Sequence, residues 1–515
     1  MASSELRQVY LPALGGLDTA TDSVLLQPTE LSTFTNAEYE RHGGRFKRGG
    51  SIKYNANAIT LSATAATISA MADFWRHGTV SSPTQQFVIT AATHSGTATV
   101  SSGGIYSGNA AGTITLLKAP WGQAGRKTSI QIAQGLAVIS DGVDTVQSYD
   151  QTNVATLSVC MPVFSACKYH LRRLFYYGVF GSVTSSSSVG YTAGGNIADA
   201  TGSDTGAFIF DEDDGDRVVG LSEPWRERLL VFKGPTRGSV HQIGGTSPVT
   251  FTKGVVFRQA APCVANAAIV TTSNDIFWMS RYGLHSLQAT QKYGDTEEAY
   301  ISFPVQNQFN QLNTSRLDQS VGFYNPTRNI IGWAAPSGTN VQNDTVFVYH
   351  YLLAFWSIWT FTDFNVSSFM LALDPLASSQ KTRLFVGDYA GFIHSADQSD
   401  KVDTSAAYTC TVTTPQILVL PGKDALTEAI FSGITTFVRP TSGTCSLAVI
   451  QDGRTAHYSV DLSDTTVNYV ETPLNGDRSR SIQLEWKHDA ATGDMNLLGY
   501  ALRYAPGETQ ARESS

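Results

Sequence analysis

LLVFKGPTRGSVHQI, residues 229–243, holds the pattern that decides the fold: a short apolar strand, a turn with glycine, and a second strand of mixed character. The same pattern recurs in IFWMSRYGLHSLQ, residues 276–288, and in LFVGDYAGFIHSAD, residues 384–397. Further copies begin at Phe87, Leu136, Leu174 and Ile330. The seven successive starts lie 49, 38, 55, 47, 54 and 54 residues apart. One four-stranded propeller blade needs roughly 40–50 residues, so this spacing predicts one blade for each copy.

A small antiparallel sheet cannot bury both of its faces alone, so repeated sheets must stack against one another around a ring. We expect the apolar strands LLVF, IFWM and LFVG to form the buried inner part of each blade. The chain is therefore predicted to be all-β, with a β-propeller-like domain of six or seven irregular blades. An irregular array of β-sandwiches is the alternative.

The repeat stops after residue 400, and alternating segments such as CSLAVIQDG and SIQLEWKHD follow. They predict a propeller domain over residues 1–403 and a C-terminal β-sandwich-like domain over residues 404–515. Residues 181–206 are dominated by Ser, Thr, Gly, Ala and Asp and are expected to be an exposed loop insertion. Residues 93–112 resemble them in composition. Residues 27–40 are the best candidate for a helix.

Composition limits the possible functions. Charged residues make up 15% of the chain and the formal net charge is -8, which disfavours a protein that grips nucleic acid. The most apolar stretch, residues 349–361, is too short to span a membrane as a helix, and the beginning of the chain has no secretory signal pattern. The five cysteines show no Cys-x-x-Cys spacing and are interpreted as reduced core thiols of a protein made in a cytoplasm.

Searches for catalytic and metal-binding motifs identify no catalytic, cofactor-binding or metal-ligating residue, so we expect a protein without enzymatic activity and without a cofactor. The segment from Gly122 to Thr128 imitates a phosphate-binding loop with the wrong glycine spacing and is interpreted as a basic surface turn. The acidic run from Asp211 to Asp216 lacks the glycine position and the distant Glu of a calcium loop and is also interpreted as a surface turn. Trp356 is interpreted, like its neighbour Trp359, as a core residue, with stacking on sugars or bases as the alternative.

Several short motifs follow one another along the chain. They are Leu14-Gly-Gly-Leu17-Asp18, Phe46-Lys-Arg48-Gly-Gly, Gly215-Asp-Arg-Val-Val-Gly220, Asn274-Asp-Ile-Phe-Trp278, Tyr324-Asn-Pro326 and Gly387-Asp388-Tyr-Ala-Gly391. In this order they resemble the nozzle or tail-hub proteins of short-tailed bacteriophages, although Gly49 stands where that family commonly has Pro.

The resemblance implies a structural virion protein at the distal end of the tail, made in the host cytoplasm. Its expected assembly is a homo-hexameric ring around the channel for genome ejection, through which double-stranded DNA passes without specific binding. The expected partners are a tail adaptor or tubular protein and tail fibres or spikes. One of the two loop regions, 181–206 or 93–112, is expected to point into the channel or to contact a fibre.

Two other functions remain open from the sequence. A propeller glycosidase or depolymerase acting on host surface polysaccharide would need acids and aromatic side chains at one mouth of the propeller, with shifted pKa values. A receptor-binding carbohydrate module would need exposed Trp and Tyr side chains.

Overall fold

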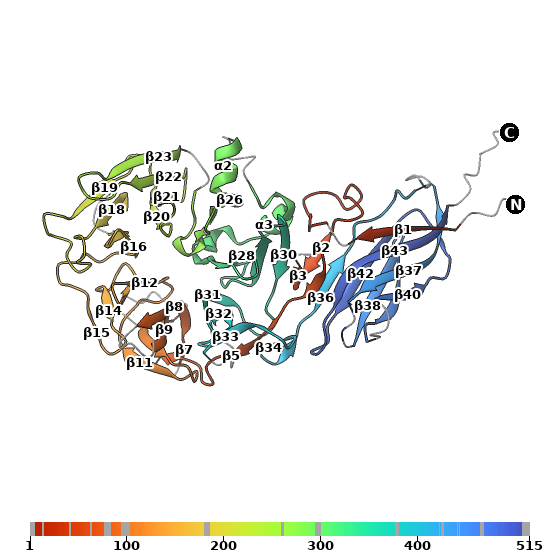
Figure 1. Cartoon of the computed structure of the whole chain (residues 1–515), viewed down its shortest axis with the longest axis horizontal. Coiled ribbons are helices and arrows are strands. Elements are labelled where there is room, and N and C mark those ends of the chain that lie inside the picture. Colours follow the sequence, from red (N-terminus) through yellow and green to blue (C-terminus); the bar gives the residue numbers. More distant parts are fainter. Residues whose placement is uncertain are drawn as a thin grey trace.

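The structure is a computed structural model. It describes residues 6–12, 15–40, 43–61, 64–76, 84–93, 103–179, 186–258, 262–293, 300–375, 381–421, 423, 427–439, 441, 443–463 and 468–506. Strands hold 52% of the chain and helices 5%, so the fold is all-β, as the sequence predicts. Figure 1 shows two parts side by side, a ring of small sheets and an elongated β-sandwich.

In the described parts of the chain, the ring consists of six four-stranded blades and one three-stranded sheet. The first three blades are β8–β11 (Thr67–Arg76, Thr84–Ala92, Gly104–Gly108, Ile114–Lys118), β12–β15 (Ser129–Ala133, Leu136–Ser140, Gln147–Tyr149, Val154–Thr156) and β16–β19 (Ala166–His170, Arg173–Tyr177, Ser188–Tyr191, Gly206–Ile209). The fourth is β20–β23 (Arg217–Leu221, Leu229–Gly234, Ser239–Gly244, Thr252–Arg258), and the three-stranded sheet is β24–β26 (Val270–Thr271, Ile276–Met279, Leu284–Ser286). The last two blades are β27–β30 (Val321–Asn325, Ile330–Ala335, Thr345–His350, Phe355–Trp359) and β31–β33 (Val366–Leu373, Thr382–Asp388, Ile393–Gln398) completed by β5 (Gly50–Lys53).

Short helical and β segments connect these sheets. They are η1 (Asn266–Ala268), α2 (Leu287–Tyr293), η2 (Phe303–Val305), α3 (Gln306–Phe309), η3 (Thr314–Gln319), β6 (Thr60–Leu61) and β7 (Thr64–Ala65). Beyond β5, the sheet of the last blade continues through β34 (Val402–Asp403) and β35 (Ala406–Ala407).

The apolar strands of the repeated hairpins are the second strands of the sheets, and their side chains alternate between two neighbouring hydrophobic clusters. In LLVF of β21, Leu229 and Val231 pack with the preceding blade β16–β19, whereas Leu230 and Phe232 pack with the following sheet β24–β26. A strand in this position is buried on both faces, so consecutive residues must all be apolar. The repeated apolar strands are therefore a consequence of the stacking of sheets around the ring. The predicted propeller-like fold is confirmed.

The ring is closed by a strand from near the beginning of the chain. Strand β5 pairs antiparallel with β33, with His394 opposite Lys53 and Ser395 opposite Ile52. On the inner side the Ser367 hydroxyl of β31 donates to the carbonyl of Ile68 in β8, at 2.7 Å. The last blade is thereby held to the first by hydrogen bonds and by a shared core.

The β-sandwich consists of two sheets. One contains β1 (Arg7–Pro12), β3 (Ala37–Tyr39), β4 (Arg45–Lys47), β37 (Ala429–Val438), β40 (Tyr469–Pro473), β41 (Arg478–Ser479) and β43 (Asn496–Pro506). The other contains β2 (Thr33–Thr35), β36 (Cys410–Thr413), β38 (Thr444–Gln451), β39 (Arg454–Asp461) and β42 (Ile482–His488).

The division at residue 403 therefore needs one correction. Strands β1 to β4, which the sequence assigned to the propeller, pair within the sandwich. Residues 27–40 do not form the expected helix either. The segment instead contains β2 and β3, which are separated by Asn36 with a φ of 53°, and Phe34 is buried in the sandwich core.

One sheet runs through both parts of the molecule. The blade β27–β30 continues through β2 into β36, β42, β38 and β39, which makes nine strands in all. The crossing point is a parallel contact in which Thr35 of β2 lies opposite Ile358 of β30. A single hydrophobic core accompanies it, with Trp333 and Trp356 from the blade and Trp486 from the sandwich. The joint between the two parts is thus built like the interior of one domain.

Both regions expected to be exposed loops contain strands. Val189 and Tyr191 of β18 are buried in the core of their blade, and so are Ile105 and Tyr106 of β10. The apolar residues that form these strands lie within a Ser- and Gly-rich context, which concealed them in the sequence. Residues 181–185 and 94–102 lie outside the described residues, so the expected channel or fibre contact stays a prediction.

Candidate functional site

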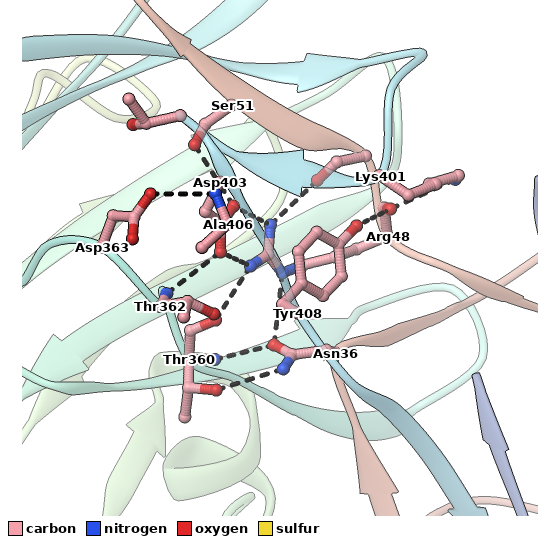
Figure 2. Close-up of polar contacts among 12 residues, drawn as sticks. Asn36, Arg48, Ser51, Thr360, Thr362, Asp363, Lys401, Asp403, Ala406 and Tyr408 are labelled. Atoms are coloured by element: carbon pink, nitrogen blue, oxygen red, sulfur yellow. Dashed lines mark hydrogen bonds and ion pairs between the residues drawn. The ribbon is translucent and has the colours of Figure 1, made fainter. Parts of the chain in front are cut away.

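Arg48 and Asp403 form a buried ion pair where the propeller meets the sandwich (Figure 2). Nη1 of Arg48 lies 3.0 Å from Oδ1 of Asp403, and Nη2 lies 2.5 Å from Oδ2. The side chains are 2% and 0% exposed. The bidentate geometry gives both charges fixed partners, as burial requires.

Every N–H of the Arg48 guanidinium has an acceptor. Besides Asp403, the group donates to the Asn36 side-chain oxygen at 3.2 Å and to the carbonyls of Thr360 and Gly49, each at 2.9 Å. The ring of Tyr408 covers the guanidinium, with its centroid 3.8 Å from Cζ. A guanidinium carries five N–H donors, so this site uses all of them.

The groups around Arg48 come from segments that are far apart in the chain. Asn36 lies between β2 and β3, Thr360 follows β30, Asp403 ends β34, and Tyr408 precedes β36. Asn36 binds several of these segments itself, since its amide nitrogen donates to the Thr409 carbonyl at 3.0 Å and its oxygen accepts from the Thr360 backbone N–H at 2.9 Å. We call the cluster of Asn36, Arg48, Thr360, Asp403 and Tyr408 the junction cluster.

A second ion cluster flanks the junction cluster. Arg328, in the turn between β27 and β28, binds Glu38 of the sandwich and Asp397 of the last blade. Burial raises the pKa of Glu38, and the charge of Arg328 opposes that shift. Both clusters therefore link the sandwich to the two blades next to it by charge-assisted hydrogen bonds.

A cavity of about 360 Å³ lies where several blades of the propeller converge. Its polar lining includes Arg126, Lys127, Asp141, Arg217 and Asp318, together with residues of β16, β17, β20 and the segment around η1. Burial lowers the pKa of Lys127 to about 8, and Asp318 opposes that shift. Burial raises the pKa of Asp141, which is only 2% exposed.

The segment from Gly122 to Thr128 forms the expected turn, with Gly125 and Arg126 exposed, but the turn faces the cavity of the propeller. The Lys127 ammonium donates to the Ser367 carbonyl at 2.5 Å, which ties the second blade to the last. Thr128 shares a hydrogen bond of 3.1 Å with Ser69, which ties the second blade to the first. The sequence placed polar residues in a turn but gave no sign that the turn faces inward.

The acidic run from Asp211 to Asp216 forms a turn that is held to the blade β20–β23 by hydrogen bonds and an ion pair. Asp216 is 4% exposed and accepts backbone N–H groups of Thr236, Arg237 and Gly238 at 2.7–2.8 Å. Asp214 pairs with the Lys233 ammonium at 2.7 Å. Within the part of the chain that the structure describes, no group of three or more His, Cys, Asp or Glu residues could hold a metal ion.

The two tryptophans are core residues, as predicted. Trp356 and Trp359 are 1% and 3% exposed. Their indole N–H groups donate to the carbonyls of Ile301 at 2.9 Å and Ala37 at 3.2 Å. The alternative in which they stack on a ligand is wrong.

The cysteines divide into four buried thiols and one exposed thiol. Cys167, Cys263, Cys410 and Cys445 are buried, whereas Cys160 is exposed, contrary to the expectation of five core thiols. No helix among the described residues has the length and apolar character needed to cross a membrane.

Comparisons with known proteins add little to this geometry. No protein-family model matches the chain, and no curated protein matches it. Among solved structures, the computationally designed Ika8 protein has a TM-score of 0.35 and 8% identity to this chain. The match covers 66% of this chain and 98% of the Ika8 chain. YCF48 bound to a D1 peptide has a TM-score of 0.38 and 10% identity, covering 68% and 97%. A glycoside hydrolase has a TM-score of 0.26 and 10% identity, covering 88% and 99%.

Proposed function

We propose that this chain is a structural virion protein that forms the distal nozzle of a short bacteriophage tail. Two independent observations support the proposal: the order of the nozzle-like motifs along the sequence, and the construction of the joint between propeller and sandwich. The joint carries the argument, because a protein that bears load in a ring needs a protomer that does not bend between its parts.

The joint is stiff for identifiable reasons. A continuous nine-stranded sheet crosses it, a shared core with three tryptophans lies against that sheet, and the junction cluster saturates the hydrogen bonds of Arg48. Domains joined by a flexible linker move relative to each other, whereas a large apolar interface with satisfied polar groups prevents such motion.

In the assembly that we propose, six copies form a ring around the channel for genome ejection. Heterologous contacts between copies need two different faces on one rigid protomer, and the propeller and the sandwich supply two such faces. A tail adaptor or tubular protein would bind above the ring, and fibres or spikes at its side. DNA would pass without specific binding, in keeping with the net charge of -8.

We also propose that the chain has no enzymatic activity. The buried carboxylate of Asp141 and the internal hydrogen bonds of the acidic run are what a structural protein needs, because these acids hold turns in place. Release of reducing ends from host polysaccharide by the purified protein would contradict this part of the proposal.

Electron microscopy tests the proposal. Negative-stain images of purified protein should show closed rings, and immunogold labelling of intact particles should place the chain at the tail tip. Label on the capsid, or absence of label from particles that contain the other tail proteins, would refute a nozzle function.

A further inference from the structure

A groove of about 740 Å³ lies between the three-stranded sheet β24–β26 and the blade β27–β30. One wall carries the tyrosines Tyr324, Tyr349 and Tyr351. The opposite wall comes from the β24–β25 turn and the start of α2, with the polar residues Asn274 and Gln288 at the rim. The groove belongs to neither the junction cluster nor the cavity among the blades.

The tyrosine wall is built by strand pairing. Tyr324 of β27 and Tyr349 of β29 both lie opposite Ile331 of the intervening strand β28, so they share one face of the blade. Tyr351 lies in the turn directly after β29 and lines the same groove. The ring centroids of Tyr324 and Tyr351 are 6.0 Å apart.

These rings are held in place before any ligand arrives. Tyr349 packs on the buried Trp356 with centroids 4.7 Å apart. The Tyr351 hydroxyl donates to the side-chain oxygen of Asn329 at 3.0 Å. Aromatic groups that are already fixed lose little conformational entropy on binding, which favours recognition.

The polar wall is equally ordered. Asp275 accepts the backbone N–H of Ile276 at 2.8 Å and that of Gln288 at 3.1 Å, and it binds the Ser286 hydroxyl. The Gln288 amide nitrogen donates to the Asn274 carbonyl at 2.6 Å, which directs the amide along the rim. Amide and hydroxyl groups of this kind provide both donors and acceptors.

The charges of the side chains that line the groove indicate which class of ligand it can bind. Among the described residues that line the groove there is no Lys or Arg, and Asp275 is the acidic one, so a phosphate-bearing ligand would meet no compensating cation from them. A neutral saccharide fits better, because its apolar ring faces pack on aromatic side chains while its hydroxyls need closely placed donors and acceptors. A proline-rich peptide also packs on aromatic grooves but uses few of the rim amides.

We propose that this groove is a binding site for neutral saccharides. Tyr351 and Tyr324 form the stacking surface, Gln288 and Asn274 bind ring hydroxyls, and Asp275 holds the polar wall in position. The site is independent of the proposed ring, because all of its residues come from one protomer.

Glycan binding by the full-length protein tests the site. An array of neutral hexose and N-acetylhexosamine oligosaccharides finds the best ligand, and isothermal titration calorimetry then measures its affinity. Tyr351→Ala and Gln288→Ala should each weaken binding about tenfold. Tyr282→Ala removes a tyrosine that is 54% exposed and lies outside the groove lining, and should leave the affinity unchanged.

Three results would overturn the proposal: no array glycan binding with a Kd of about 10 mM or tighter, equal losses in Tyr351→Ala and Tyr282→Ala, or preferential binding of a polyproline peptide. Thermal unfolding of each variant separates loss of the site from loss of the fold. If electron microscopy shows rings but no glycan binds, the saccharide site is refuted and the proposed nozzle function is not. If glycans bind but no rings form, the nozzle function is refuted and the saccharide site is not.

Discussion

Arg48 and Asp403 are 355 residues apart in the chain, yet they form a two-pronged ion pair with almost no exposure to solvent. The pair joins the strand that closes the propeller, which begins two residues after Arg48, to the first segment after the last blade. Ring closure and attachment of the sandwich therefore depend on the same contact.

Asp403→Asn should lower the free energy of unfolding by about 3–5 kcal/mol, because it leaves the Arg48 guanidinium buried without its counter-charge. Glu223→Gln breaks the Lys168 pair at a carboxylate that is 51% exposed, and should change stability by less than about 1 kcal/mol. Urea unfolding measures both. Similar losses in the two variants would mean that the junction cluster contributes no more than a surface pair.

Gly50→Ala should be strongly destabilising, by about 2–4 kcal/mol, because a Cβ atom there would lie 2.3 Å from the carbonyl oxygens of both Asp400 and Val402. In Gly433→Ala the nearest atom is the Thr472 carbonyl oxygen at 3.5 Å, so that variant should stay within about 1 kcal/mol of the parent. Chemical unfolding compares the two glycines. If Gly50→Ala lost little stability, this would show that β5 can move away from the segment leading into β34.

One thiol should react with Ellman's reagent in the folded protein and five after unfolding. Burial raises the pKa of each of Cys167, Cys263, Cys410 and Cys445 to about 12, whereas Cys160 is exposed. Cys160→Ser should abolish the native reaction and leave the total after unfolding one lower. Fast reaction of more than one native thiol would contradict the burial of the other four.

Two buried histidines should make the protein less stable in acid. Burial lowers the pKa of His285 to about 3 and that of His488 to about 4, and the charges of Lys47 and Lys401 assist the shift at His488. Between pH 6.5 and 4 the unfolded chain binds protons that these folded imidazoles do not, so this stability is lost as the pH falls.

His488→Gln should therefore lose less melting temperature than the parent between pH 7 and pH 4.5. Comparing variant and parent isolates the histidine from buried carboxyls such as Glu38 and Asp275, whose raised pKa values act in the opposite direction. Calorimetric scans across this range provide the measurement. Parallel curves would show that the pKa of His488 is not lowered in the folded protein.

The sequence predicted the blades because apolar runs such as LLVF, each followed by a turn with glycine, recur at the spacing of one blade. In the structure the run in β21 is buried on both faces. It did not predict that strands β1 to β4 join the sandwich, because pairing such as that between β1 and β43 depends on segments that are far apart in the sequence. Arg48 was noticed within a nozzle-like motif, but no local signal connects it to Asp403. The sequence did not indicate the groove for a related reason, because Asn274 and Tyr324 come together only when two sheets stack.

The pairing of β1 with β43 also sets the order of events during synthesis. Tyr10 cannot reach its partner Ala501 until the ribosome has made almost the whole chain, whereas blades β8–β11 and β12–β15 are complete hundreds of residues earlier. The backbone groups of β1 that pair with β43 therefore stay unpaired while the propeller forms. A nascent chain stalled before residue 496 would display that open edge to any chaperone or neighbouring copy able to pair with it.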